Sequence, residues 1–246
     1  IKRKFFYGDL IAFNFNYYYK NKISKNLFYK KDKDLSIRDI KTYFHRFLIK
    51  PNKNSLFTTC WSKLYKTKLL SSEKKVFFDE KLFLCEDTDF VFRFLSKVKF
   101  VQYINFPMYF HTLAKGKRNL NKATFGTKLP LRCQISFLSA IEACQNYLIK
   151  NNDKLSSIQA KINHCISVYI VIYTIRSCIK INSISDFIKT YLFWKKIYKK
   201  KIVYNSINDY SPKLASGGKL IPYLIKNKTY LLAVIAAFLF SRKRYF

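Results

Sequence analysis

The chain has 246 residues, of which 49% are hydrophobic and 18% aromatic. This is enough apolar material for a buried core, and it excludes an intrinsically disordered tail. Lys and Arg number 47 against 14 Asp and Glu, so the formal net charge is +33. That charge attracts polyanions such as nucleic acid, anionic lipid or phosphorylated sugars. An A/T-rich coding sequence is the competing explanation, because it raises Lys, Asn, Ile, Phe and Tyr together.

The basic residues are spread along the whole chain, which is untypical of a dedicated nucleic-acid patch, so we expect no specific nucleic-acid partner. The six cysteines form no C-x-x-C pair and have no His at metal-ligand spacing. Neither a zinc site nor a thioredoxin-like redox site is therefore favoured. A reduced, cytoplasmic protein is the expectation. No signal-peptide pattern is found near the first residue, so we do not expect export.

The first part of the chain reads as a mixture of strands and helices. Residues 9–15 form a compact apolar run, which predicts a buried strand. Apolar residues recur at spacings of three and four from 35 to 48, where Ser36 can cap the start, and this predicts an amphipathic helix. Residues 56–61 are then predicted as a strand and residues 63–70 as a short helix.

The next predicted helix opens with Glu86, Asp87 and Asp89, because the helix macrodipole favours carboxylates in the first turn. A strand over residues 99–104 follows, and Pro107 is expected to start the exit from it. Further on, the pattern becomes helical over residues 131–149, 155–179 and 184–198. The fold class is therefore α/β with a mainly helical C-terminal region, and the boundary is expected near residues 113–130.

Two blocks of sequence carry a family resemblance. The block Trp61-Ser62-Lys63-Leu64-Tyr65 and the run from Phe78 to Phe90, which includes Glu80, Leu82 and Glu86-Asp87, follow each other after a short connector. They resemble the Trp-x-Lys-Leu-Tyr and Phe-x-Glu-x-Leu-x-x-Gly-Glu-Asp motifs of bacterial family 2 glycosyltransferases. A strand and the aromatic run from Pro107 to His111 come next, as they do in that family.

The resemblance implies an inverting transfer, which needs a carboxylate to take the proton from the attacking acceptor hydroxyl. By resemblance Asp87 is this general base, and Glu86 is a neighbour that orients the acceptor or the base. From composition alone, acidic residues at a helix N-terminus are more often simple dipole partners. The order of the motifs is what favours catalysis.

The resemblance also implies roles for other residues. Trp61 and Lys63 are expected to bind the acceptor, and Trp61 on its own would also suit a core position. His111 and Arg118 are expected near the metal or the diphosphate, with a packed or surface histidine as the alternative for His111. The chain departs from the family pattern at two positions, which have Ser62 where Asn is common and Cys85 where Gly is usual. The Cys85 side chain is expected to narrow the acceptor pocket.

The fold implied by the resemblance is an incomplete GT-A-like nucleotide-diphospho-sugar transferase domain. The half that binds the nucleotide sugar is expected to be missing, and with it the Asp-x-Asp motif that holds a divalent metal, Mg or Mn. Asp32-Lys33-Asp34 has the right letters, but we expect a solvated loop there, because this segment follows the strand at residues 9–15. The chain alone is therefore expected not to transfer sugar.

The predicted organisation is an acceptor-side part over residues 1–115, a helical extension over 116–205 and a basic amphipathic segment over 206–246. An apolar run from Tyr230 to Phe240 lies between basic residues. At about 20 residues needed to span a bilayer, this run is too short. It is predicted either as an interfacial helix that inserts Leu231, Val234, Ile235, Phe238 and Leu239 into the membrane, or as a core helix.

Three functions follow. The leading hypothesis is an enzyme that transfers sugar from a nucleotide-sugar donor to a glycan or glycolipid acceptor. Its product would be a bacterial surface polysaccharide or lipooligosaccharide, made in the cytoplasm with peripheral contact at the inner face of the cell membrane. The second is a non-catalytic remnant or one half of a split transferase. The third is a basic helical module that binds nucleic acid, for which the charge is the evidence.

Overall fold

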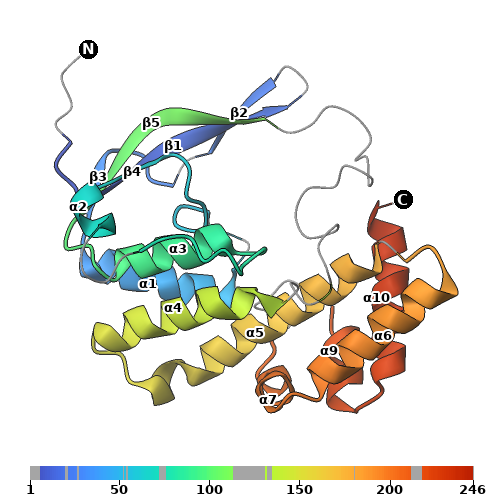
Figure 1. Cartoon of the computed structure of the whole chain (residues 1–246). Coiled ribbons are helices and arrows are strands. Elements are labelled where there is room, and N and C mark those ends of the chain that lie inside the picture. Colours follow the sequence, from blue (N-terminus) through green and yellow to red (C-terminus); the bar gives the residue numbers. More distant parts are fainter. Residues whose placement is uncertain are drawn as a thin grey trace.

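The computed structural model describes residues 6–19, 22–26, 28–51, 53, 55–71, 76–112, 131, 135–179, 181–211 and 218–245. Over these residues a twisted sheet lies on a layer of helices, and further helices extend from one end of that layer (Figure 1). The mixed α/β class predicted from the sequence is confirmed. Arg118 and the predicted boundary at 113–130 lie outside the described residues, and the three predicted units stay a prediction.

The sheet has five strands in the described chain. These are β1 (Leu10–Tyr19), β2 (Lys22–Asn26), β3 (Lys33–Leu35), β4 (Lys63–Tyr65) and β5 (Val101–Thr112). Their order is β2-β1-β5-β3, with β4 also paired to β1. The β1–β5 pair is parallel, and the other pairs are antiparallel. The strand predicted at residues 9–15 is confirmed and is longer, because β2 and β5 supply partners beyond the apolar run.

Three local predictions need correction. Residues 56–61 are turns and bends, a strand runs over Lys63–Tyr65, and the helix predicted over residues 63–70 begins only at Thr67. The strand β5 does not end at Pro107 but continues to Thr112. The reason is an irregularity in the ladder, because Phe13 pairs with Ile104 while Asn14 pairs with Pro107. A bulge of this kind tolerates a proline, which has no N–H to donate.

The long helices predicted from the sequence are present in the described chain, although α4 begins later than predicted, and the helices at residues 201–208 and 220–226 were not predicted. The helices of the described chain are α1 (Ile37–Ile49), α2 (Thr67–Leu70), α3 (Glu86–Leu95), α4 (Phe137–Lys150), α5 (Leu155–Cys178), α6 (Ile184–Tyr198), α7 (Lys201–Asn208), α9 (Leu220–Lys226) and α10 (Tyr230–Tyr245). The predicted cap is confirmed, because the Ser36 hydroxyl accepts from the Asp39 N–H in a capping box. None of the described helices is long and apolar enough to cross a membrane.

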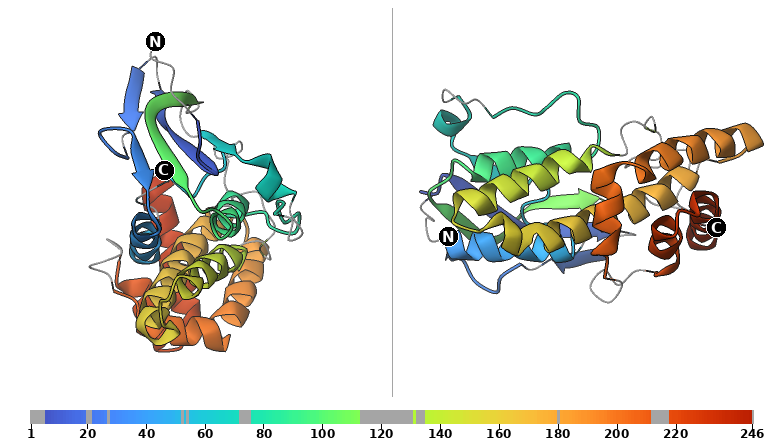
Figure 2. Two further views of the ribbon diagram at one scale, coloured as in Figure 1. Left: turned by 90° about the vertical axis from the view of Figure 1, so that its left-hand side faces the viewer. Right: turned by 90° about the horizontal axis from the view of Figure 1, so that it is seen from below.

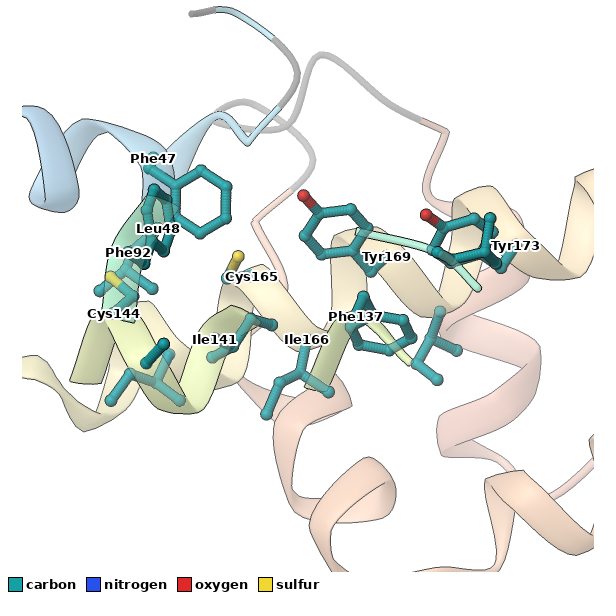
Figure 3. Packing of buried hydrophobic residues seen from close by; sticks show 14 of the residues in the cluster. Phe47, Leu48, Phe92, Phe137, Ile141, Cys144, Cys165, Ile166, Tyr169 and Tyr173 are labelled. Atoms are coloured by element: carbon teal, nitrogen blue, oxygen red, sulfur yellow. The ribbon is translucent and has the colours of Figure 1, made fainter. Parts of the chain in front are cut away.

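The helix α5 is the centre of the helical layer. It is apolar nearly all round, which is the pattern of a helix surrounded by other helices. Phe137 of α4 stacks on Tyr169 and Tyr173 of α5 with ring centroids 5.0 and 5.6 Å apart, and Figure 3 shows these rings side by side. One cluster of buried side chains continues from Leu10 of β1 to Ala237 of α10, so sheet and helices share a core.

The buried carboxylate of Asp89 forms an ion pair within α3 and a hydrogen bond to α4. Asp89 is 2% exposed, and its Oδ2 accepts from Arg93 Nη2 at 2.6 Å and Nε at 2.8 Å. Its Oδ1 accepts from the Ser139 hydroxyl of α4 at 2.8 Å. Arg93 also donates to the Phe77 carbonyl. Asp89 is therefore more than the dipole partner that its place in the first helical turn suggested.

We expect Asp89→Ala to lower the free energy of unfolding by about 3 kcal/mol, because it leaves a charged guanidinium and a hydroxyl without their buried partner. Urea unfolding followed by circular dichroism measures this. The matched control is Glu142→Gln on the exposed side of α4, which should change the free energy by less than about 0.5 kcal/mol. An Asp89→Ala variant as stable as the control would contradict the role of this ion pair.

Candidate active site

Asp87 lies at the start of α3, where a turn from the middle of the chain meets the helix. Its Oδ2 accepts from the Cys60 backbone N–H at 3.3 Å. The next residue, Thr88, donates from its hydroxyl to the Thr58 carbonyl at 3.0 Å. Both contacts come from residues 56–61, the segment that was predicted as a strand. This segment forms a turn, and its backbone groups bind the start of α3. Asp87 itself is half-buried, so its carboxylate is fixed and remains partly accessible.

An aromatic wall forms around the ring of Trp61, the residue after the one that binds Asp87. Trp61 follows Cys60 directly, and its ring stacks on Tyr109 at 4.6 Å and on His111 at 5.5 Å, both from β5. Phe15 of β1 closes the wall edge-on, with its centroid 4.5 Å from that of Trp61. An aromatic face of this kind suits the apolar side of a sugar ring. The structure therefore brings the predicted site residues Trp61 and His111 into contact, and it joins Asp87 to Cys60, the residue before Trp61.

Sequence reasoning missed Tyr109 and Phe15 as members of this wall. The signal for Tyr109 was present, because Tyr109 and His111 are two residues apart and side chains of a strand alternate between faces. It was overlooked because Pro107 was expected to end the strand. No comparable signal marked Phe15, which reaches Trp61 through the pairing of β1 with β4, the strand that follows Trp61.

The Lys63 side chain binds the turn that carries Trp61. Its ammonium donates to the Trp61 carbonyl at 3.2 Å and to the Thr59 hydroxyl at 3.4 Å, so it holds the turn that carries the wall. Burial lowers the pKa of Lys63 to about 7, although the nearby Cys60 and Asp87 act in the opposite direction. Contact of Lys63 with the acceptor stays a prediction.

The Cys60 thiol is a neutral group beside Asp87. Burial raises its pKa to about 12, and the hydrogen bond to Asp87 and the charge of that carboxylate add to the effect. The Tyr65 hydroxyl donates to the Cys60 carbonyl at 2.8 Å, which fixes this residue from the other side. The five described cysteines are free, and Cys133 lies outside the described residues.

Lys63 gives a pH-dependent prediction. Its folded-state pKa is near 7, against about 10.4 in the unfolded chain, so between these values the unfolded chain binds more protons and stability rises with pH. We therefore compare the free energies of unfolding of Lys63→Met and the wild-type protein. The difference should favour Lys63→Met more at pH 6 than at pH 10. Denaturant titrations of both proteins at these pH values test this, and a difference that is constant with pH would contradict a buried, titrating Lys63.

The two departures from the family pattern have one physical explanation. Ser62 has a backbone φ of 58° and Cys85 one of 59°, both in the left-handed region. Asn and Gly are the residues that adopt this conformation with least strain. Here Ser62 compensates with a hydrogen bond to the Asn14 carbonyl at 3.0 Å. The Cys85 thiol lies 3.5 Å from the Tyr173 hydroxyl and thus packs towards α5, while narrowing of the acceptor pocket stays a prediction.

The left-handed backbone at Cys85 predicts that Gly is more stabilising than Ala at this position, the reverse of the order in a helix. Both Cys85→Ala and Cys85→Gly remove the thiol, but only Ala keeps a Cβ that the left-handed backbone disfavours. We expect the Gly variant to be more stable by about 1 kcal/mol. At the exposed helical control Thr42 the order should reverse, with Ala more stable than Gly by about 1 kcal/mol. Thermal unfolding of the four variants decides, and the same order at both positions would contradict the strained backbone.

The remaining predicted residues are placed as follows. Glu86 is half-buried at the first position of α3, near enough to Cys85 and Tyr173 that its charge contributes to the raised pKa of both. His111 has one face on Trp61 and its edge near Tyr17, with centroids 5.7 Å apart. Among the described residues no three His, Cys, Asp or Glu side chains form a metal site. His111 is thus the one predicted metal ligand described, and it does not make a site by itself.

Asp32-Lys33-Asp34 lies at the other edge of the sheet. Lys33 begins β3, so the predicted loop is in part an edge strand. Asp32 accepts from the Asn105 backbone N–H at 2.8 Å, and Asp34 accepts from the Tyr7 hydroxyl at 3.0 Å. These residues line a shallow hollow with Gln102 and Tyr103 that contains none of the residues around Asp87. This segment has no part in the candidate active site.

Comparison with known proteins identifies the fold but not the family. No family model matches the chain, and neither does any curated protein. Two crystal structures of S. aureus TarS 1-349, one with UDP and one with UDP-GlcNAc, match with a TM-score of 0.53 at 10% sequence identity. The matches cover 96% and 97% of this chain, but 59% and 61% of the TarS chains. The chain thus has a glycosyltransferase-like fold and spans less than two thirds of the TarS chains that it matches.

Proposed function

We propose that this chain is the acceptor-side part of an inverting glycosyltransferase of family 2 and GT-A type. It would act on a nucleotide-sugar donor and a glycan or glycolipid acceptor in the synthesis of a bacterial surface polysaccharide or lipooligosaccharide. The observation that carries the proposal is the Asp87 carboxylate, held at a helix start by the backbone N–H of Cys60, which directly precedes Trp61 and its aromatic wall. The likeness to TarS structures that contain UDP and UDP-GlcNAc supports the donor class.

In this proposal each group has its own task. The Trp61 wall would hold the apolar face of the acceptor sugar, which places one of its hydroxyls near Asp87. As that oxygen forms a bond to the anomeric carbon, Asp87 takes its proton, and the bond to the nucleoside diphosphate breaks on the opposite face. The Cys60 N–H keeps the carboxylate in position during the transfer. Inversion at the anomeric carbon follows from this single displacement.

A divalent metal would neutralise the diphosphate leaving group. The described residues do not form such a site, so in this proposal the metal and most contacts to the donor come from a nucleotide-binding half that completes the enzyme. One half of a split transferase is therefore the second candidate. The outward-facing Phe106, Met108 and Phe110 of β5 favour it, since each is more than half exposed on a parallel strand pair of a kind usually covered on both faces.

Asp87→Asn tests the proposal in the intact gene product that binds a donor. The amide keeps the size of the side chain but cannot take the proton, so turnover should fall by ~10²–10⁴. Binding of the nucleotide sugar, measured by calorimetry, should barely change. Glu86→Gln is the matched control next to it and should cost less, because an orienting neighbour is not the proton acceptor. Near-normal turnover in Asp87→Asn would overturn the assignment.

A further inference from the structure

The last helix, α10, buries its small side chains and exposes its large ones. The residues packed against the rest of the protein are at most 7% exposed, and they are Ala233, Val234, Ala236 and Ala237. The outer α10 face consists of residues that are 36–61% exposed, namely Leu231, Leu232, Ile235, Leu239 and Phe240. A helix that only filled a core would place its leucines inside. The distribution indicates that the outer face itself meets an apolar environment.

The structure corrects the list of residues that were predicted to insert into a membrane. Val234 was expected to enter a membrane but is fully buried. Phe238 was expected there as well, but it is half-buried against Phe187 of α6, with ring centroids 6.3 Å apart. The Arg242 guanidinium lies over the Phe238 ring at 4.8 Å, which further occupies that side chain. Leu231, Ile235 and Leu239 remain, spaced by one helical turn each.

The charge around this face identifies the kind of partner. Residues 210–246 contain no Asp or Glu. Lys219, Lys226 and Lys228 are exposed on α9 and on the turn that leads into α10. A second copy of this chain would bring the same positive charge against this one, since each copy has a net charge of +33. A partner that has an apolar interior and a negatively charged surface matches both the exposed apolar residues and the lysines.

We propose that the outer α10 face docks on an anionic lipid bilayer, with the helix lying in the plane of the headgroups. Its leucines would enter the acyl boundary while the lysines stay among the lipid phosphates. Tyr223 of α9, which is 63% exposed, is of a residue type that suits such an interface because it has an apolar ring and a polar hydroxyl. With 16 residues, α10 is long enough to lie on a bilayer and too short to cross one.

Co-sedimentation of the full chain with vesicles tests the proposal. We expect binding to vesicles of phosphatidylcholine with 30% phosphatidylglycerol, loss of most binding in high salt, and little binding to phosphatidylcholine alone. Leu231→Ser combined with Leu239→Ser should weaken partitioning by about tenfold for each leucine, as expected for removing half-exposed apolar side chains from lipid. Both residues are exposed in the free protein, so the fold should be retained, which circular dichroism checks.

The control is a pair of equally exposed apolar residues elsewhere. Ile149 and Leu155 are 41% and 44% exposed on either side of the turn between α4 and α5. Figures 1 and 2 show that this turn and α10 lie at opposite ends of the helical layer. Their double replacement by Ser should leave vesicle binding unchanged. Equal binding by the α10 variant, or self-association in sedimentation velocity that this variant abolishes, would overturn the proposal.

Discussion

The first turn of α3 is the point on which the rest of the molecule depends. Three successive residues each bind a different part of the chain there. Asp87 accepts from Cys60 in the preceding turn, Thr88 donates to Thr58, and Asp89 pairs with Arg93 and accepts from Ser139 of α4. These three residues thus fix the candidate base, the turn that carries the aromatic wall and the contact between α3 and α4.

This arrangement explains why the site needs an irregular backbone. Within a few residues the turn has to contact α3 and then enter β4, and it does so through a left-handed Ser62, while α3 itself starts from a left-handed Cys85. Strain of this kind is stored where the surrounding contacts hold the backbone in place. On the opposite side β5 bulges around Pro107 and so keeps Tyr109 and His111 on the side of Trp61.

The helical region follows a different rule, in which side-chain size decides which side is buried. At the centre, α5 buries most of its second half and packs Tyr169 and Tyr173 against Phe137 of α4. At the end of the chain, α10 approaches its neighbours closely with alanines, so its larger residues have to point outward. The apolar surplus outside and the excess of lysine around it are two independent features, and an anionic bilayer is the environment that accommodates both.

The sequence by itself determined the amphipathic helix after Ser36, the helix that opens at Glu86, the long helices after residue 155 and the strand at residues 9–15. These follow from local periodicity and capping, which act within a few residues. It also singled out Asp87, Trp61 and His111. Only the tertiary structure decided that residues 56–61 form a turn, that β5 continues through Pro107 and that the Lys63 ammonium binds the Trp61 carbonyl. Those features depend on strand pairing and packing between segments distant in the chain. The sequence left open which face of α10 is buried, for the same reason. Both faces are apolar, and only packing against the neighbouring helices selects the buried one.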